Sequence, residues 1–152
     1  MTSYELWLFL HVSATIVWVG GAVMGQVFGV LTKRAANPVE SAAFGRNMAW
    51  VAKWVFLPSS IAVIVTGIGL TEDGNWQWSE PFVLIGLLVG IAVAAVGIGY
   101  VTPRMGRAGA RIAAEGPSPA LLAEMNTLVW IARGLILVLF VIVFMMVAKL
   151  GT

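Results

Sequence analysis

The chain has 152 residues, of which 60% are hydrophobic and 11% are charged, and its formal net charge is +2. Its mean hydropathy is +0.94, whereas a soluble domain usually contains about 25% charged residues, so the composition excludes a soluble globular protein. The chain has no cysteine, which excludes disulfides, thiolate metal sites, iron–sulfur clusters and cysteine nucleophiles. We therefore predict a single integral membrane domain over residues 1–152.

Four apolar segments are long enough to cross a membrane. About 20 residues are needed to cross the hydrocarbon core, and a spanning backbone must satisfy its own hydrogen bonds, which favours helices. The segments lie at residues 6–31, 48–70, 82–101 and 128–147. The sequence predicts an all-α, four-helix transmembrane bundle. The first span is too long for a signal peptide and lacks its basic flank, so we expect it to be retained.

Lysine and arginine lie almost entirely on one side of the predicted membrane. Eight of these nine residues lie between or beside the first and second spans or the third and fourth spans, and only Lys149 lies on the other side. By the positive-inside rule, we expect both basic loops in the cytoplasm and both termini outside. We expect a multi-pass protein of the bacterial cytoplasmic membrane, in contact with the lipid bilayer and with no nucleic-acid partner.

His11 is the only histidine in the chain, and it lies inside the first span. An ionisable side chain at membrane depth is costly and therefore marks a candidate functional site. We interpret His11 first as a residue that hydrogen-bonds between helices and second as an axial ligand of haem b. Because there is no second histidine, the other axial ligand would be Met145 or Met146, which lie at a similar depth, or a water molecule.

Small residues recur every four positions in two of the predicted spans. Such stripes allow the backbones of two helices to approach closely. The first span contains Gly21, Gly25 and Gly29, and the third contains Gly86 and Gly90. These glycines predict helix packing, either within the chain or against a partner.

Two helices have clear start signals. Asn37-Pro38 and Ser118-Pro119 each place a capping side chain before a proline at the first helical position. We expect the second and fourth helices to begin there and to extend two to three turns beyond the membrane. Pro58 lies in the middle of the second span and predicts a kink, because proline removes a hydrogen-bond donor.

A short sequence recurs 80 residues apart, as Trp50-Val51-Ala52-Lys53 and Trp130-Ile131-Ala132-Arg133. Each copy lies where a helix enters the membrane from the basic side, and its cation can reach back to the interface. We predict that Trp50, Lys53, Trp130 and Arg133 anchor the interface. The recurrence indicates either two duplicated helical hairpins or independent anchoring of two helices.

The run from His11 to Gly21, with Trp18 and Gly20 between them, resembles the first helix of an uncharacterised family of small four-helix predicted integral membrane proteins. The resemblance continues at Leu57-Pro58, Thr66-Gly67 and Met146-Val147-Ala148-Lys149 and covers most of the chain. The His-x6-Trp-x-Gly element is also distantly similar to the copper-resistance D domain and to the haem-binding HemJ type of protoporphyrinogen oxidase. The last resemblance implies that His11 is a haem ligand.

Motifs typical of enzymes are not evident in the sequence: we find no glycine-rich phosphate loop, no Ser-His-Asp set and no pair of carboxylates in a span. The first functional hypothesis is therefore a non-catalytic accessory or scaffold subunit of a larger membrane assembly, such as a transporter or respiratory complex. Its small-residue faces would contact other membrane subunits or a second copy of the chain. The alternative is a small b-type haem or redox membrane protein that uses His11 as an axial ligand.

Overall fold

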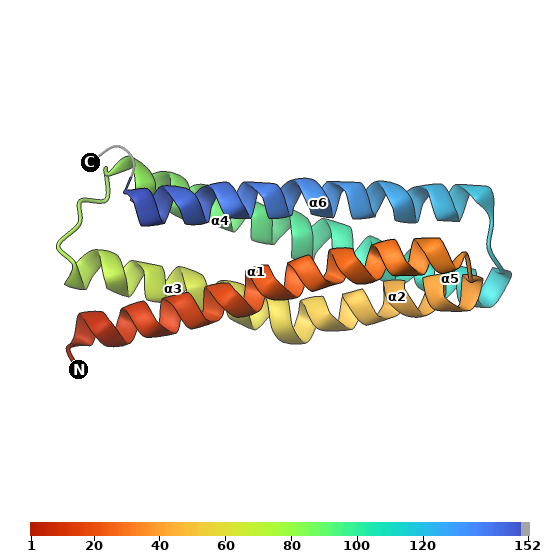
Figure 1. The fold of residues 1–152 in the computed structure, drawn as a ribbon, viewed down its shortest axis with the longest axis horizontal. Coiled ribbons are helices and arrows are strands. Elements are labelled where there is room, and N and C mark those ends of the chain that lie inside the picture. Colours follow the sequence, from red (N-terminus) through yellow and green to blue (C-terminus); the bar gives the residue numbers. More distant parts are fainter. Residues whose placement is uncertain (150–152) are drawn as a thin grey trace.

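The computed structural model describes residues 1–149 and forms an antiparallel bundle of long helices (Figure 1). Four helices in the described part of the chain are long and apolar enough to cross a membrane. They comprise α1 (Ser3–Ala35), α2 with η1 and α3 (Pro38–Val51, Ala52–Phe56 and Leu57–Asp73), α4 with η2 and α5 (Pro81–Val96, Gly97–Val101 and Thr102–Glu115), and α6 (Pro119–Ala148). The predicted all-α, four-helix architecture is confirmed.

The two ends of the bundle differ in charge. We call the end where α1 begins and α6 ends the terminal end, because both ends of the described chain lie there (Figure 1). The opposite end, where α1 passes to α2 and α5 passes to α6, carries most of the lysine and arginine residues and is called the basic end.

The predicted helix starts are confirmed by their capping hydrogen bonds. The side chain of Asn37 accepts the backbone N–H of Val39 at 2.9 Å, and the side chain of Ser118 accepts that of Leu121 at 3.2 Å. These contacts satisfy N–H groups that the first helical turn leaves free. Both helices begin about two to three turns before their apolar spans, at Pro38 and Pro119.

The second and third long helices each contain a π-helical segment that ends two residues before a proline. The segment η1 precedes Pro58, where the kink was predicted, and η2 precedes Pro103, which lies just beyond the third predicted span. A proline lacks the donor that an α-helix needs, and a wider turn is one way in which a helix continues past it. The two π-helical segments contact each other in mid-bundle. A duplication of hairpins would relate the second long helix to the fourth. The π-helical segments instead occur in the second and third, so they give no support to duplicated hairpins.

Helix packing is tight at the basic end and loose at the terminal end. Helices α2 and α5 touch through their backbones, because a Cβ atom on Gly45 would overlap the carbonyl oxygen of Met105, and one on Gly109 would lie 2.6 Å from that of Ala42. Toward the terminal end, α1 pairs with α3 and α4 pairs with α6, and the two pairs diverge (Figure 1). This divergence positions the candidate site.

Candidate functional site

A cavity of about 560 Å³ lies between the two diverging helix pairs at the terminal end. Helices α1, α3, α4 and α6 all contribute to its wall, which is mainly apolar. The polar side chains in the wall are those of Tyr4, His11, Thr15, Thr71 and Lys149. The volume is within the range of about 300–1,000 Å³ that is typical of ligand and cofactor sites.

His11 is held at this wall by a hydrogen bond between α1 and α3. Its Nδ1 lies 3.0 Å from Oγ1 of Thr66. The Thr66 hydroxyl donates its single proton to the carbonyl of Ala62, 2.6 Å away, or of Val63, 3.2 Å away, so it accepts the proton of Nδ1–H. The tautomer assigned in this way leaves a lone pair on Nε2. The interhelical hydrogen bond predicted for His11 is therefore present.

Backbone features also fix the imidazole of His11. A Cβ atom on Gly67 would lie 3.3 Å from Cε1 of His11, so the ring lies directly against the backbone of α3. The hydroxyl of Thr15 donates to the carbonyl of His11 at 2.8 Å, one turn along α1. The residue pair Thr66-Gly67 thus supplies both the hydrogen-bond acceptor and the space for the ring.

The structure separates the two candidate methionine ligands. Met146 lines the same cavity as His11, and its methyl group lies against Gly86 of α4, whereas Met145 is not part of the cavity wall. Successive residues of an α-helix point about 100° apart, and here Met146 faces the cavity while Met145 points away from its wall. His11 and Met146 lie on opposite helix pairs, α1 with α3 and α4 with α6.

The mouth of the cavity carries aromatic rings and one cation. Trp76 packs edge-on against Phe82 with 5.3 Å between ring centroids, and Nζ of Lys149 lies 4.4 Å from the centroid of Trp76. The indole of Trp78 donates to Glu72 at 3.0 Å. Trp76, Trp78 and Lys149 all line the cavity. Indole rings at such a position suit a membrane–water interface, where one edge is apolar and the other is hydrated.

The glycines of the first span face other parts of the same chain. A Cβ atom on Gly21 would contact Phe56, one on Gly25 would contact Met48, and one on Gly29 would contact Phe44. In α4, Gly86 faces Met146, whereas a Cβ atom on Gly90 would meet open space, and Gly90 lines the cavity. Close helix packing within the chain therefore occupies Gly21, Gly25, Gly29 and Gly86.

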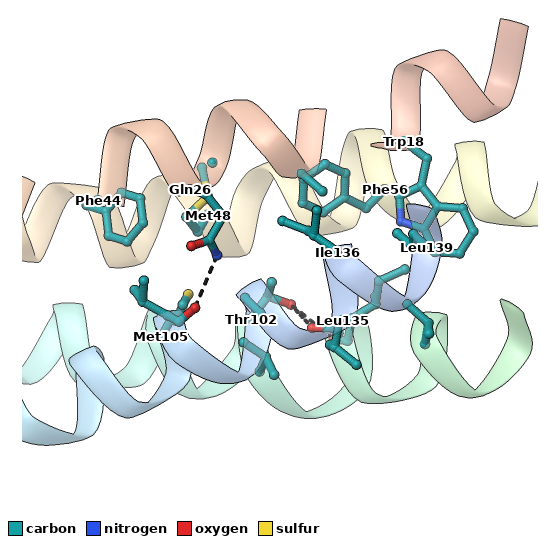
Figure 2. Close-up of a pocket in the computed structure, with 18 residues that line it drawn as sticks. Trp18, Gln26, Phe44, Met48, Phe56, Thr102, Met105, Leu135, Ile136 and Leu139 are labelled. Atoms are coloured by element: carbon teal, nitrogen blue, oxygen red, sulfur yellow. Dashed lines mark hydrogen bonds between the residues drawn. The ribbon is translucent and has the colours of Figure 1, made fainter. Parts of the chain in front are cut away.

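A second, smaller cavity of about 80 Å³ lies nearer the basic end (Figure 2). Trp18 and Leu139 line both cavities, and both are buried, so they separate the two spaces. Gln26 also lines the small cavity, and its amide donates to the carbonyl of Val129 at 3.1 Å. Sequence reasoning missed Gln26, although an uncharged polar residue in an apolar span was an available signal.

The two predicted anchor cations, Arg133 and Lys53, differ in the tryptophan that each one contacts. The guanidinium of Arg133 lies 4.2 Å from the ring of Trp130, three residues earlier in α6. Lys53, in contrast, lies over Trp54, 5.4 Å away, and not over Trp50. Lys53 is part of the π-helical segment η1, whose wider turn rotates it relative to Trp50. Trp50 is 61% exposed and Trp130 is 58% exposed.

Comparison with known proteins identifies the family but gives no activity. No curated protein and no solved structure matches the chain. A family model described as predicted integral membrane protein (DUF2269) matches residues 5–150. The protein is therefore a membrane protein that belongs to this family.

Proposed function

We propose that this protein binds one haem b in the cavity at the terminal end, with Nε2 of His11 as an iron ligand. The observation that carries this proposal is the hydrogen bond from Nδ1–H of His11 to Thr66 at a cavity of about 560 Å³. Histidines that bind metals usually donate their other ring N–H to a protein acceptor, which fixes the tautomer and orientation of the ring. Thr66 does both for His11.

The donor atoms fit an iron porphyrin better than they fit a quinone. A lone pair on Nε2 can bind a metal ion or accept a hydroxyl proton, but it cannot donate to a quinone carbonyl. Met146 brings a thioether to the same cavity from the opposite helix pair, and histidine with methionine is a known axial pair for haem in electron-transfer proteins. The remaining wall is mainly apolar, as the porphyrin ring requires.

Lys149 is suited to bind a carboxylate at the mouth. It lines the cavity beside Trp76, and within residues 1–149 no other lysine or arginine lies at the terminal end. When bound, haem would supply one-electron redox chemistry at its iron. The residues of this chain would orient the ring, exclude water and hold the iron ligands. This proposal makes the protein a small redox membrane protein and assigns no catalytic residue.

Adjacent methionines provide a matched test of the proposal. Met146→Leu removes the thioether in the cavity, whereas Met145→Leu makes the same chemical change outside it. After purification from the native host, we expect Met146→Leu to alter the absorption spectrum of the bound haem and Met145→Leu to leave it unchanged. Equal spectra for both variants would remove Met146 from the site, and a colourless wild-type protein would overturn haem binding itself.

An accessory role in a larger membrane assembly is a second proposal. It is favoured by Gly20 of α1 and Gly134 of α6, which are exposed. A Cβ atom on either glycine would meet no side chain or other helix within 4 Å, so a partner helix has room to approach closely. The partner would be another membrane subunit or a second copy of this chain. We expect Gly20→Ile and Gly134→Ile to release such a partner from complexes isolated from native membranes. Isolation of the wild-type chain alone, as a monomer, would contradict this role.

The orientation and location of the protein follow from its charges. We propose that the basic end faces the cytoplasm of a bacterium and that the terminal end faces outward, because lysine and arginine are retained on the cytoplasmic side. The haem cavity would then open toward the outer surface of the cytoplasmic membrane.

A further inference from the structure

Helices α1 and α6 meet near the basic end through polar side chains. Nζ of Lys33 donates to Oδ1 of Asn126 at 2.9 Å, and Nε of Arg133 donates to Oε1 of Gln26 at 3.4 Å. Each helix supplies one cation and one amide: Gln26 and Lys33 are seven residues apart on α1, and Asn126 and Arg133 are seven residues apart on α6. Seven residues correspond to about 10 Å along a helix. We call this group of four residues the polar seam.

Neither cation of the polar seam is neutralised by a carboxylate. In residues 1–149, the ion pairs are Arg104 with Glu124 and Arg111 with Glu115. Lys33 and Arg133 instead donate to the amide oxygens of Asn126 and Gln26, which do not cancel a charge. A cation inside a transmembrane segment is costly unless it reaches the interface or meets an anion. The seam therefore has positive charge that the chain itself leaves unbalanced.

The guanidinium of Arg133 points toward the basic end. Its Cζ lies 4.2 Å from the ring of Trp130, which comes three residues earlier in α6 and therefore closer to that end. Arg133 uses Nε for Gln26, so its terminal N–H groups are available for oxygen atoms in the direction of Lys33. An arginine fork and a lysine ammonium are the usual protein ligands of phosphate.

The surface beside the polar seam is apolar and open to lipid. Trp130 is 58% exposed, and Leu137, one turn beyond Arg133 on α6, is 63% exposed. A phosphate held between Lys33 and Arg133 would thus have an apolar surface on the membrane side, where an acyl chain can pack. A free phosphate ion would make no use of that surface.

We infer that the polar seam binds the phosphate of an anionic phospholipid in the leaflet at the basic end, between Lys33 and Arg133. Basic side chains between transmembrane helices are a recurring way to hold such headgroups. Two uncompensated cations select a lipid with net negative charge over a zwitterionic one. This site is separate from the haem cavity, and its occupancy does not depend on haem.

The test is a lipid titration of the whole chain, and native mass spectrometry measures how much of each lipid is bound. The probes are phosphatidylglycerol, phosphatidylcholine and inorganic phosphate. We expect the wild type to bind phosphatidylglycerol about thirtyfold more tightly than phosphatidylcholine, because each cation near the membrane surface contributes about a fivefold preference. Lys33→Gln with Arg133→Gln should bring the two lipids to within about twofold of each other.

A matched control removes two cations outside the polar seam, both on the second long helix. Arg46→Gln with Lys53→Gln changes the net charge equally but leaves the polar seam intact, and this variant should retain the preference. If the double seam variant does not fold, Lys33→Gln alone removes an exposed cation without breaking the contact between Arg133 and Gln26, and should lower the preference about fivefold.

Three results would overturn the inference. The first is a wild type with no preference for the anionic lipid, and the second is an equal loss in the control variant. The third is release of phosphatidylglycerol by excess inorganic phosphate that itself binds to the protein, because the site would then belong to a soluble phosphate.

Discussion

The hydroxyl of Thr66 accepts a hydrogen bond from Nδ1 of His11 across 3.0 Å, and this contact joins α1 to α3 in the terminal half of the bundle. The same hydroxyl donates to the backbone of its own helix at Ala62. One threonine thus sets the position and the tautomer of the only histidine in the chain. The proposed iron ligand depends on this arrangement.

Replacement of Thr66 by valine should weaken the bundle by about 1 kcal/mol, because it removes the hydroxyl that accepts the N–H of His11. Thr71→Val is the matched control, since Thr71 is equally buried but donates only to the carbonyl of Gly67 in its own helix. Unfolding in a mild detergent measures both effects. Thr66→Ser retains the hydroxyl and should restore most of the stability; equal losses for both valine variants would contradict the account.

Replacement of Gly45 by alanine should destabilise the bundle by about 2 kcal/mol or more. The new methyl group would overlap the carbonyl oxygen of Met105, and a backbone atom in a packed helix pair cannot move aside cheaply. Gly134→Ala places the same group in open space on α6 and should be nearly neutral. Unfolding curves of the two variants in detergent check this difference, and similar curves would show that α2 and α5 do not pack as described.

The predictable part of this fold rests on local signals. Apolar length gives the four spans, and Asn37 and Ser118 mark helix starts because capping depends on neighbouring residues only. The partner of His11 was not predictable, because Thr66 lies 55 positions away and the contact depends on how α1 packs against α3. Met145 and Met146 could not be separated either, since the inward face of α6 is set by tertiary packing.

Two features of the central part of the bundle were missed for different reasons. Pro103 lies just beyond the third apolar span, in a segment whose glycines and arginines gave no clear helix pattern, yet the helix continues through it by a π-helical segment. Gln26 carries no charge and so did not interrupt the first span, although it links α1 to α6 through Val129 and Arg133.

Replacement of Trp18 by alanine should join the two cavities. Trp18 is 5% exposed and forms part of both walls, so its loss creates empty volume and should cost about 3–5 kcal/mol. Trp18→Phe retains most of the ring and should cost clearly less. Thermal unfolding monitored by circular dichroism compares the two variants. If Trp18→Ala unfolded at the same temperature as the wild type, the indole would not fill the space between the two cavities.

Single cysteines can test the orientation, because the chain has no cysteine of its own. Asn75→Cys places a thiol in the loop at the terminal end, and Ala114→Cys places one at the basic end; both positions are exposed. A membrane-impermeant maleimide added to intact cells should label Asn75→Cys and leave Ala114→Cys unlabelled until the cells are opened. The reverse pattern would invert the orientation inferred from the positive-inside rule.

The central claim is that His11 binds haem iron, and the difference spectrum of reduced minus oxidised protein tests it most directly. The wild type and His11→Ala are purified from membranes of the native host under identical conditions, with helicity checked by circular dichroism. We predict a Soret band in the wild type that is lost or strongly reduced in His11→Ala while the helical content is retained. A wild-type protein without a Soret band, or a band of equal position and intensity in His11→Ala, would contradict the claim.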